Sequence, residues 1–317
     1  ADYYGPVRSI AELQLVDDIE SPLLLLLPSV LCVGEIMDSV RWSDAFRYTQ
    51  HRVVLRSDVT FERRKGYESG YYLGSPFRLL GRYDFEAGNN FRAGVTAESD
   101  AGEPWFKNGG RGFDLYRFYV EASNLSNVNR VVVGSYRVGF GRGLLFGQQA
   151  YGDRLSQVLN RNSSSYGVSG YGGVSEQPTL LGAATTIQFS RFTVTPFYGY
   201  TALDADTVGG VWYSFSTSGY HRTKTEIARR STLGLHTIGA NVAYNQRYFN
   251  VGVTAYGGFF SLPAVLGSDD WSANDFVGDS QWGVSLNYGL HKSKVWFSGE
   301  TALSQGVAVA TTNTLLV

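Results

Sequence analysis

The sequence contains a single cysteine, Cys32, and no hydrophobic run long enough to cross a membrane as a helix. One cysteine excludes an internal disulfide framework and a cysteine-based metal cluster. A membrane helix needs about 18 or more consecutive apolar residues, whereas the most apolar run, Leu23 to Leu27, stops at Pro28. The net charge is only −1, from 27 basic and 28 acidic residues, which argues against a nucleic-acid-binding protein as a whole.

Glycine and aromatic residues, in contrast, are abundant. The 317 residues include 38 glycines, 21 tyrosines, 19 phenylalanines and 6 tryptophans. Little of the chain shows the periodicity of an amphipathic helix. This combination favours an all-β architecture.

Apolar and polar residues alternate along most of the chain after residue 47. In HTIGANVAYNQRYFNVGVTAYGGF at 236–259, Ile238 and Val242 belong to the apolar set, which passes to Val251 and Val253 after a break. A period of two is typical of a strand with one apolar and one polar face. The pattern predicts about twelve strands, at 51–61, 77–86, 91–98, 113–123, 130–140, 179–189, 192–202, 238–245, 249–256, 281–290, 294–303 and 306–317. Most have the length that a tilted strand needs to cross a bilayer.

The connections between these strands alternate between long and short. The long ones are 62–76, 99–112, 141–178, 203–234 and 260–280, and the short ones are 87–90, 124–129, 190–191, 246–248 and 291–293. Only the connection near 303–306 is short where a long one is due. Bacterial outer-membrane barrels have short periplasmic turns at one rim and long extracellular loops at the other. Residues 41–317 are therefore predicted to form a transmembrane antiparallel up-and-down β-barrel in a Gram-negative outer membrane, with the N-terminus in the periplasm.

Charged residues fall on the polar phase of the predicted strands. Aromatic residues gather on the apolar phase near strand ends, as in the girdles of membrane barrels, so we expect the apolar phase to face lipid. The alternative is a soluble barrel or sandwich whose apolar phase faces inward. The predicted interior charges are Arg52, Arg56, Asp58, Arg78, Arg82, Asp84, Glu86, Arg92, Glu98, Arg117, Glu121, Arg137 and Glu300. Neighbouring opposite charges among them can pair and narrow the interior.

Two short helices are predicted before residue 40. Ser9 and Glu12 have capping-box spacing, and Ser21-Pro22 offers an N-cap followed by a proline at the first helical position. The hairpin turn between the two helices consists of Asp17, Asp18, Ile19 and Glu20.

The stretch SIAELQLVDDIESPLLLLLPSV at 9–30 resembles the helix-hairpin-helix unit of competence-type DNA-binding proteins. Its fusion to a barrel resembles a group of Bacteroidota envelope proteins, and LGSP at 73–76, AESDAGEPWF at 97–106 and FGRGLLFG at 140–147 are similar to that group's barrel. The resemblance implies a periplasmic segment at 1–40 that leads into the barrel. Outer-membrane barrels also usually end on a terminal aromatic residue, so the ending at Val317 leads us to expect further strands beyond this window.

DNA is not an expected partner. The hairpin lacks the glycine that would present backbone N–H groups to phosphate, and residues 1–40 carry one basic residue against seven acidic ones, a net charge of −6. Such a surface repels phosphate. The expected partners are outer-membrane lipid and other envelope proteins.

The sequence predicts no catalytic, cofactor or metal site. The histidines His51, His221, His236 and His291 lie far apart in sequence, and no serine is distinguished as a nucleophile. The aspartates Asp204, Asp206, Asp269, Asp270 and Asp275 are predicted to lie in long loops, where solvated acidic residues are commoner than Ca²⁺ ligands. GFGRGLLFG at 139–147 follows a predicted strand and opens no helix, so we expect a segment packed into the lumen or a loop rather than a phosphate cradle. TKTEIARR at 223–230 is predicted to form a short helix.

The sequence therefore favours a scaffold or a narrow gated conduit within an envelope complex, because mixed interior charges can pair and close a narrow barrel. An open porin-type diffusion channel is the first alternative. A DNA-uptake conduit that uses the helical hairpin is the second.

Overall fold

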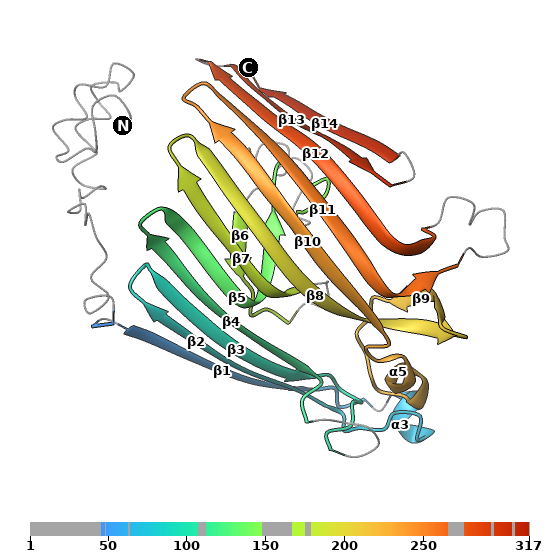
Figure 1. Ribbon diagram of the computed structural model, residues 1–317. Coiled ribbons are helices and arrows are strands. Elements are labelled where there is room, and N and C mark those ends of the chain that lie inside the picture. Colours follow the sequence, from blue (N-terminus) through green and yellow to red (C-terminus); the bar gives the residue numbers. More distant parts are fainter. Residues whose placement is uncertain are drawn as a thin grey trace. The chain divides into compact units, whose positions relative to one another are not determined.

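Figure 1 shows the computed structural model of the chain, which divides into two units, Ala1–Asp44 and Ala45–Val317. The structure describes residues 46–47, 49–62, 64–106, 112–147, 167–174, 179–265, 276–292, 295–305 and 308–316, all in the second unit. The predicted helical hairpin at Asp17, Asp18, Ile19 and Glu20 lies outside these residues. So do Asp269, Asp270 and Asp275.

The second unit is an all-β sheet in which neighbouring strands are almost all antiparallel. Its main path holds β1 (Thr49–Val59), β2 (Phe77–Ala87), β3 (Phe91–Ser99), β4 (Leu115–Leu125), β5 (Val128–Gly139), β7 (Leu180–Phe189), β8 (Phe192–Val208), β10 (Leu233–Asn245), β11 (Phe249–Ala264), β12 (Gly278–Lys292), β13 (Val295–Ser304) and β14 (Ala308–Leu316). Two further strands lie off this path, β6 (Gly167–Gly170) beside β5 and β9 (Val211–Ser216) beside β8 and β11. The described residues thus hold 14 strands rather than about twelve.

Every predicted strand range overlaps a strand of the main path, and the short turns that follow β2, β4, β7 and β10 lie together at the rim opposite α3 and α5 (Figure 1). The prediction that 203–234 is a loop is wrong. There β8 continues to Val208, β9 follows, and β10 begins at Leu233. Asp204 and Asp206 therefore lie on β8, not in a loop. The predicted loop 141–178 also contains a strand, β6.

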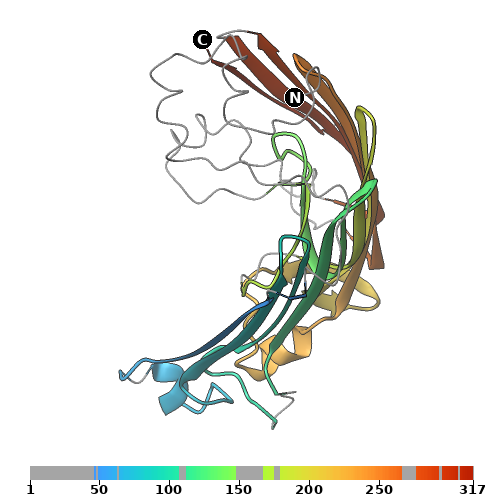
Figure 2. The ribbon, with the colours of Figure 1, turned by 90° about the vertical axis from the view of Figure 1, so that its left-hand side faces the viewer.

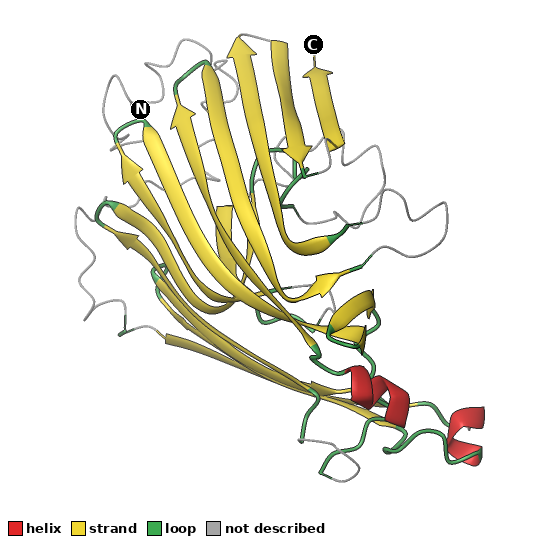
Figure 3. Cartoon of the chain, turned by 45° about the vertical axis from the view of Figure 1, so that its right-hand side comes forward, coloured by secondary structure: helices red, strands yellow, loops and turns green. Residues whose placement is uncertain are grey.

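Two short helices, α3 (Lys65–Glu68) and α5 (Lys224–Arg229), lie at the rim with the long connections (Figure 3). The helix predicted at 223–230 is confirmed as α5. It begins with a capping box, in which Glu226 N–H donates to Thr223 Oγ1 at 3.2 Å and Thr223 N–H donates to Glu226 Oε2 at 3.0 Å. Among the described residues no helix is long and apolar enough to cross a membrane.

The apolar phase of the sheet is exposed and the polar phase is buried. Val253 and Leu286 are 43% and 45% exposed, whereas Thr254 and Ser285 on the adjacent positions are each 1% exposed. A soluble barrel shows the reverse pattern, because there the apolar side chains fill the interior. The side chains of this sheet therefore have the inverse of the arrangement in a soluble β-protein, with the apolar phase exposed and the polar phase buried.

The sheet is curved across its width (Figure 2). We call the face that carries the buried polar phase its inner face. In the part of the chain that the structure describes, no register joins β1 to β14, so both are edge strands. β1 is exposed along nearly its whole length because it has a neighbour on one side only.

The strands β4 and β5 separate at Gly134. Its φ of 102° lies where side-chain-bearing residues are strained, and a Cβ at this position would lie 2.4 Å from the carbonyl oxygen of Phe118. Beyond this glycine, Tyr136 to Gly139 pair with β6 instead of β4. Gly134 thus allows β5 to leave β4, so that the end of β5 pairs with β6.

Replacing this glycine is expected to destabilise the sheet. Gly134→Ala should lower the free energy of unfolding by about 1–3 kcal/mol, because the positive φ and the Phe118 carbonyl both oppose a side chain. Gly81→Ala is the control, since the nearest atom to its Cβ would be a Leu55 methyl at 3.8 Å. Urea unfolding followed by tryptophan fluorescence measures both. Equal midpoints for the two variants would contradict this account of the β4–β5 separation.

Candidate functional site

Ion pairs cross the polar phase of the first strands. Arg78 Nε donates to Glu98 Oε1 at 2.8 Å and also pairs with Asp100 Oδ1 at 3.1 Å. Arg82 Nε pairs with Asp84 Oδ2 at 2.8 Å. These carboxylates are buried or nearly so, and burying a charge is costly unless it is paired and hydrogen-bonded. The pairing therefore makes a charged interior face compatible with folding.

Glu121 on β4 is the most connected of these interior carboxylates. It is 2% exposed, pairs with Arg92 Nη2 at 2.6 Å and lies 3.4 Å from Arg130 Nε. Its second oxygen accepts the backbone N–H of Gly170 on β6 at 2.9 Å. Glu121 thus links the wall of the sheet to a segment that lies against its inner face.

The remaining predicted interior charges have different environments. Arg56 and Asp58 pair with each other at 2.8 Å on exposed β1. Arg52 faces Asp84 and Glu86 faces Arg92 in the strand registers, but within the described ranges neither Arg52 nor Glu86 forms an ion pair. Arg117 and Arg137 contact the residues that follow β6. All of the predicted interior charges lie on strands, but the structure brings only some of them together.

Arg117 and Arg137 both contact the ring of Tyr171, the first residue after β6. The guanidinium carbon of Arg137 lies 3.4 Å from the ring centre of Tyr171, and that of Arg117 lies 5.1 Å from it. Arg117 also donates to the carbonyl oxygen of Gly173. Thr96 Oγ1 donates to Gly172 O at 2.7 Å. Residues 167–174 therefore lie along the inner face of β3, β4 and β5.

A second stretch of the same connection, Phe140–Gly147, lies against strands on the other part of the sheet. Glu300 on β13, 1% exposed, accepts the backbone N–H groups of Arg142 at 2.6 Å and Leu144 at 3.1 Å through Oε2. Arg142 also donates to Thr314 Oγ1 on β14. Gly141 has a φ of 58°, and a Cβ there would lie 2.8 Å from the Glu300 carboxyl carbon. This glycine permits the close approach to Glu300.

Aromatic rings on the inner face pack against this stretch. The ring centre of Phe146 lies 5.2 Å from that of Phe197 on β8 and 4.9 Å from that of Tyr256 on β11, both edge-to-face. Phe140 stacks on Phe197 at 6.0 Å. We call Phe140–Gly147 and Gly167–Val174 together the interior insert. Parts of one connection thus contact inner-face side chains from β3 to β14.

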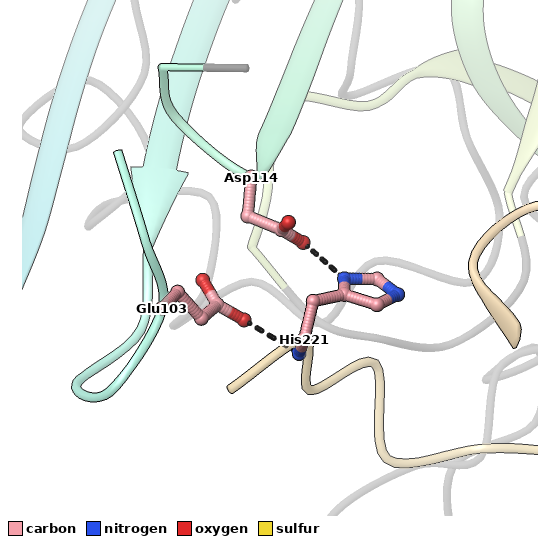
Figure 4. A group of neighbouring side chains, drawn as sticks. All are labelled: Glu103, Asp114 and His221. Atoms are coloured by element: carbon pink, nitrogen blue, oxygen red, sulfur yellow. Dashed lines mark hydrogen bonds and ion pairs between the residues drawn. The ribbon is translucent and has the colours of Figure 1, made fainter. Parts of the chain in front are cut away.

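A second polar site lies at the rim with the long connections, around His221 (Figure 4). The imidazole Nδ1 lies 2.6 Å from Asp114 Oδ2, and Nε2 lies 2.8 Å from Asp204 Oδ2. The His221 backbone N–H donates to Glu103 Oε1 at 3.1 Å. Arg230 Nη1 pairs with the other Asp114 oxygen at 3.0 Å. We call Glu103, Asp114, Asp204, His221 and Arg230 the rim cluster.

Two pKa values in the rim cluster are raised, those of His221 and Glu103. Burial alone would lower the pKa of His221, but hydrogen bonds to the carboxylates of Asp114 and Asp204 outweigh it and raise the pKa to about 9. Burial, together with repulsion from Asp114, raises the pKa of Glu103 to about 7. At neutral pH His221 is therefore an imidazolium whose two ring N–H groups each donate to a carboxylate.

Glu103, Asp114 and His221 also present ligand-type atoms within 4.8 Å of one another, the spacing of a possible metal site. Both ring nitrogens of His221 already lie within hydrogen-bond distance of carboxylate oxygens, those of Asp114 and Asp204. The guanidinium of Arg230 already neutralises Asp114. The arrangement is thus that of an ion-pair cluster.

Sequence reasoning did not find the rim cluster. His221 and Asp114 are 107 residues apart, and they come from connections whose course the strand periodicity does not determine. One sequence feature that could have indicated the cluster is the acidic stretch AESDAGEPWF at 97–106, which contains Glu103.

In comparisons with known proteins, no family model matches this chain, and no curated protein shows significant similarity to it.

Proposed function

We propose that this chain is an integral β-barrel protein of a Gram-negative outer membrane, with its N-terminus in the periplasm. The observation that carries the proposal is the inverted burial of the sheet, whose exposed phase bears Val251, Val253, Val284 and Leu286. Lipid-facing strands of membrane barrels alternate apolar outside and polar inside in this way. Short turns at one rim and long connections at the other support the same assignment.

The proposal requires that the edges β1 and β14 be paired in the membrane. Unpaired backbone N–H and C=O groups in hydrocarbon are costly, so spanning sheets are closed. The two edges are the first and last of the twelve strands on the main path, eleven steps apart, and neighbouring strands on it alternate in direction. They are therefore antiparallel to one another, as closure of an up-and-down barrel requires.

We further propose that the barrel acts as a scaffold or a narrow gated conduit within an envelope complex. The interior insert supports this, because it lies on the inner face and is held there by Glu121, Arg117 and Glu300. An open porin keeps a wide water-filled lumen. The contacts of the insert from β3 to β14 favour a restricted lumen instead.

Conductance measurements test this proposal. Purified protein reconstituted into a planar lipid bilayer is expected to insert and to show little or no steady conductance, because the interior insert narrows the path of ions. A large steady conductance would favour the open porin. A protein that stays monodisperse in detergent-free buffer and does not associate with lipid would contradict the membrane assignment itself.

A further inference from the structure

Three long connections meet at residues 220–222. Leu73 N–H from the β1–β2 connection donates to Arg222 O at 2.9 Å. The same connection is bound to the β3–β4 connection, since Gly74 N–H donates to Gly102 O at 2.8 Å. The side chain of Arg222 passes over Gly102, whose φ of 101° would strain any residue that carries a side chain. Arg222 also stacks on Tyr220, with 3.8 Å between its guanidinium carbon and the ring centre.

His221 connects these loops to the sheet through hydrogen bonds. It is 6% exposed and binds Asp114 just before β4, Asp204 on β8, and Glu103 in the β3–β4 connection. Among the described residues, the charged groups around it are Asp100, Glu103 and Asp114 from the β3–β4 connection, Asp204 from β8, and Arg222, Glu226 and Arg230 from the β9–β10 connection. Asp204 also accepts the N–H of Ser231 at 2.8 Å.

We propose that the rim cluster is a pH-sensitive clasp. It joins the three connections while His221 carries both ring protons, and it releases the connections when His221 loses one of these protons. With both protons present, each nitrogen donates to an acidic oxygen. After loss of one, a nitrogen lone pair faces a carboxylate across the same short distance, and the positive charge that separates Asp114 from Asp204 is gone. This inference concerns the rim alone and stands whether or not the barrel conducts.

The direction of the pH dependence follows from the shifted pKa values. The pKa of His221 is about 9, above its ordinary 6.5, so its contribution is fully present below 6.5 and is lost as pH rises through 9. Glu103 acts in the same direction, because its pKa is raised to about 7 and its burial therefore costs least when it is protonated. Glu103 therefore weakens the clasp as pH rises from 4.5 to about 7, and His221 weakens it as pH rises from 6.5 to about 9.

Hydrogen–deuterium exchange of the full chain in detergent micelles tests the clasp. After correction for the intrinsic pH dependence of exchange, protection of peptides covering 217–223 and 100–106 is expected to fall by up to about tenfold per pH unit between pH 6.5 and pH 9 and to level off above pH 9. His221→Gln should leave both peptides weakly protected at every pH. His236→Gln is the matched control, because His236 is exposed on the sheet and its hydrogen-bond partner among the described residues is Tyr198 Oη. It should behave as the wild type.

Protection that stays constant from pH 7 to pH 10.5 in the wild type would overturn the proposal. So would a pH dependence that His221→Gln leaves unchanged. If that variant does not fold, NMR titration of the His221 ring in the wild-type protein decides. A midpoint near the ordinary 6.5 instead of about 9 refutes the clasp.

Discussion

Val253→Arg is expected to prevent stable assembly of the protein into lipid bilayers, whereas an arginine on the inner face is expected to be accepted. Val253 is 43% exposed on β11, opposite Leu286 of β12, on the phase that we assign to lipid. Arginine at the midplane of a membrane barrel costs about 2–4 kcal/mol. For a barrel of ordinary stability that is a large share of the free energy of unfolding.

The inner-face control must be chosen from the structure. Thr254 is adjacent in sequence, but it is 1% exposed and accepts a hydrogen bond from Asn241 Nδ2 at 2.8 Å, so a large residue there would also disturb packing. Thr312 on edge strand β14 is only partly buried and lies directly across from Glu300. Thr312→Arg therefore adds the same charge beside an acidic group.

The measurement is the fraction of protein that folds into lipid vesicles, observed as the band that resists SDS until it is heated. Val253→Arg should lose most of this band, and Thr312→Arg should keep it. If both variants fold equally well, the exposed apolar phase does not face lipid.

The second large effect is expected from Glu300→Ala, which should raise the conductance of the reconstituted protein severalfold. The substitution leaves the N–H groups of Arg142 and Leu144 without their acceptor. Each buried donor left unpaired costs about 1–3 kcal/mol. Because Glu300 is the contact of the interior insert with β13, its loss should free Phe140–Gly147 from that strand and widen the path.

Two further variants isolate the role of the carboxylate. Glu300→Gln keeps a side-chain oxygen that can accept from the same N–H groups, so its conductance should stay closer to that of the wild type. Glu86→Ala removes an interior acid that forms no ion pair within the described ranges, and it should leave conductance unchanged. A Glu300→Ala protein that folds and conducts no better than the wild type would show that the insert does not limit the lumen.

The strand positions could be predicted because period-two alternation is a local property of the chain. It placed the interior charges on strands, Glu121 and Glu300 among them. It did not identify their partners, because Glu300 accepts from backbone groups of residues 142 and 144, more than 150 positions earlier in the chain. Contacts of that separation depend on how a connection crosses the sheet, which no local pattern encodes.

The β8–β9 ribbon, in contrast, had a sequence signal that was not recognised. Gly209 and Gly210, with φ of 63° and 83°, form the two-residue turn of a hairpin. A glycine pair between alternating residues is a strong hairpin signal, because both positions need a positive φ. The acidic residues Asp204 and Asp206 made this ribbon look like a solvated loop. In the structure they bind His221 and Arg229, respectively.

The most direct test of the account is a labelling scan along β11. With Cys32 replaced by serine, single cysteines at 251 to 255 would carry an environment-sensitive fluorophore in the protein reconstituted into lipid vesicles. Emission should alternate with a period of two, blue-shifted and quenched by lipid-borne quenchers at 251, 253 and 255, because these positions form the exposed phase. The opposite phase, or no alternation, would contradict a membrane barrel with an apolar outer face.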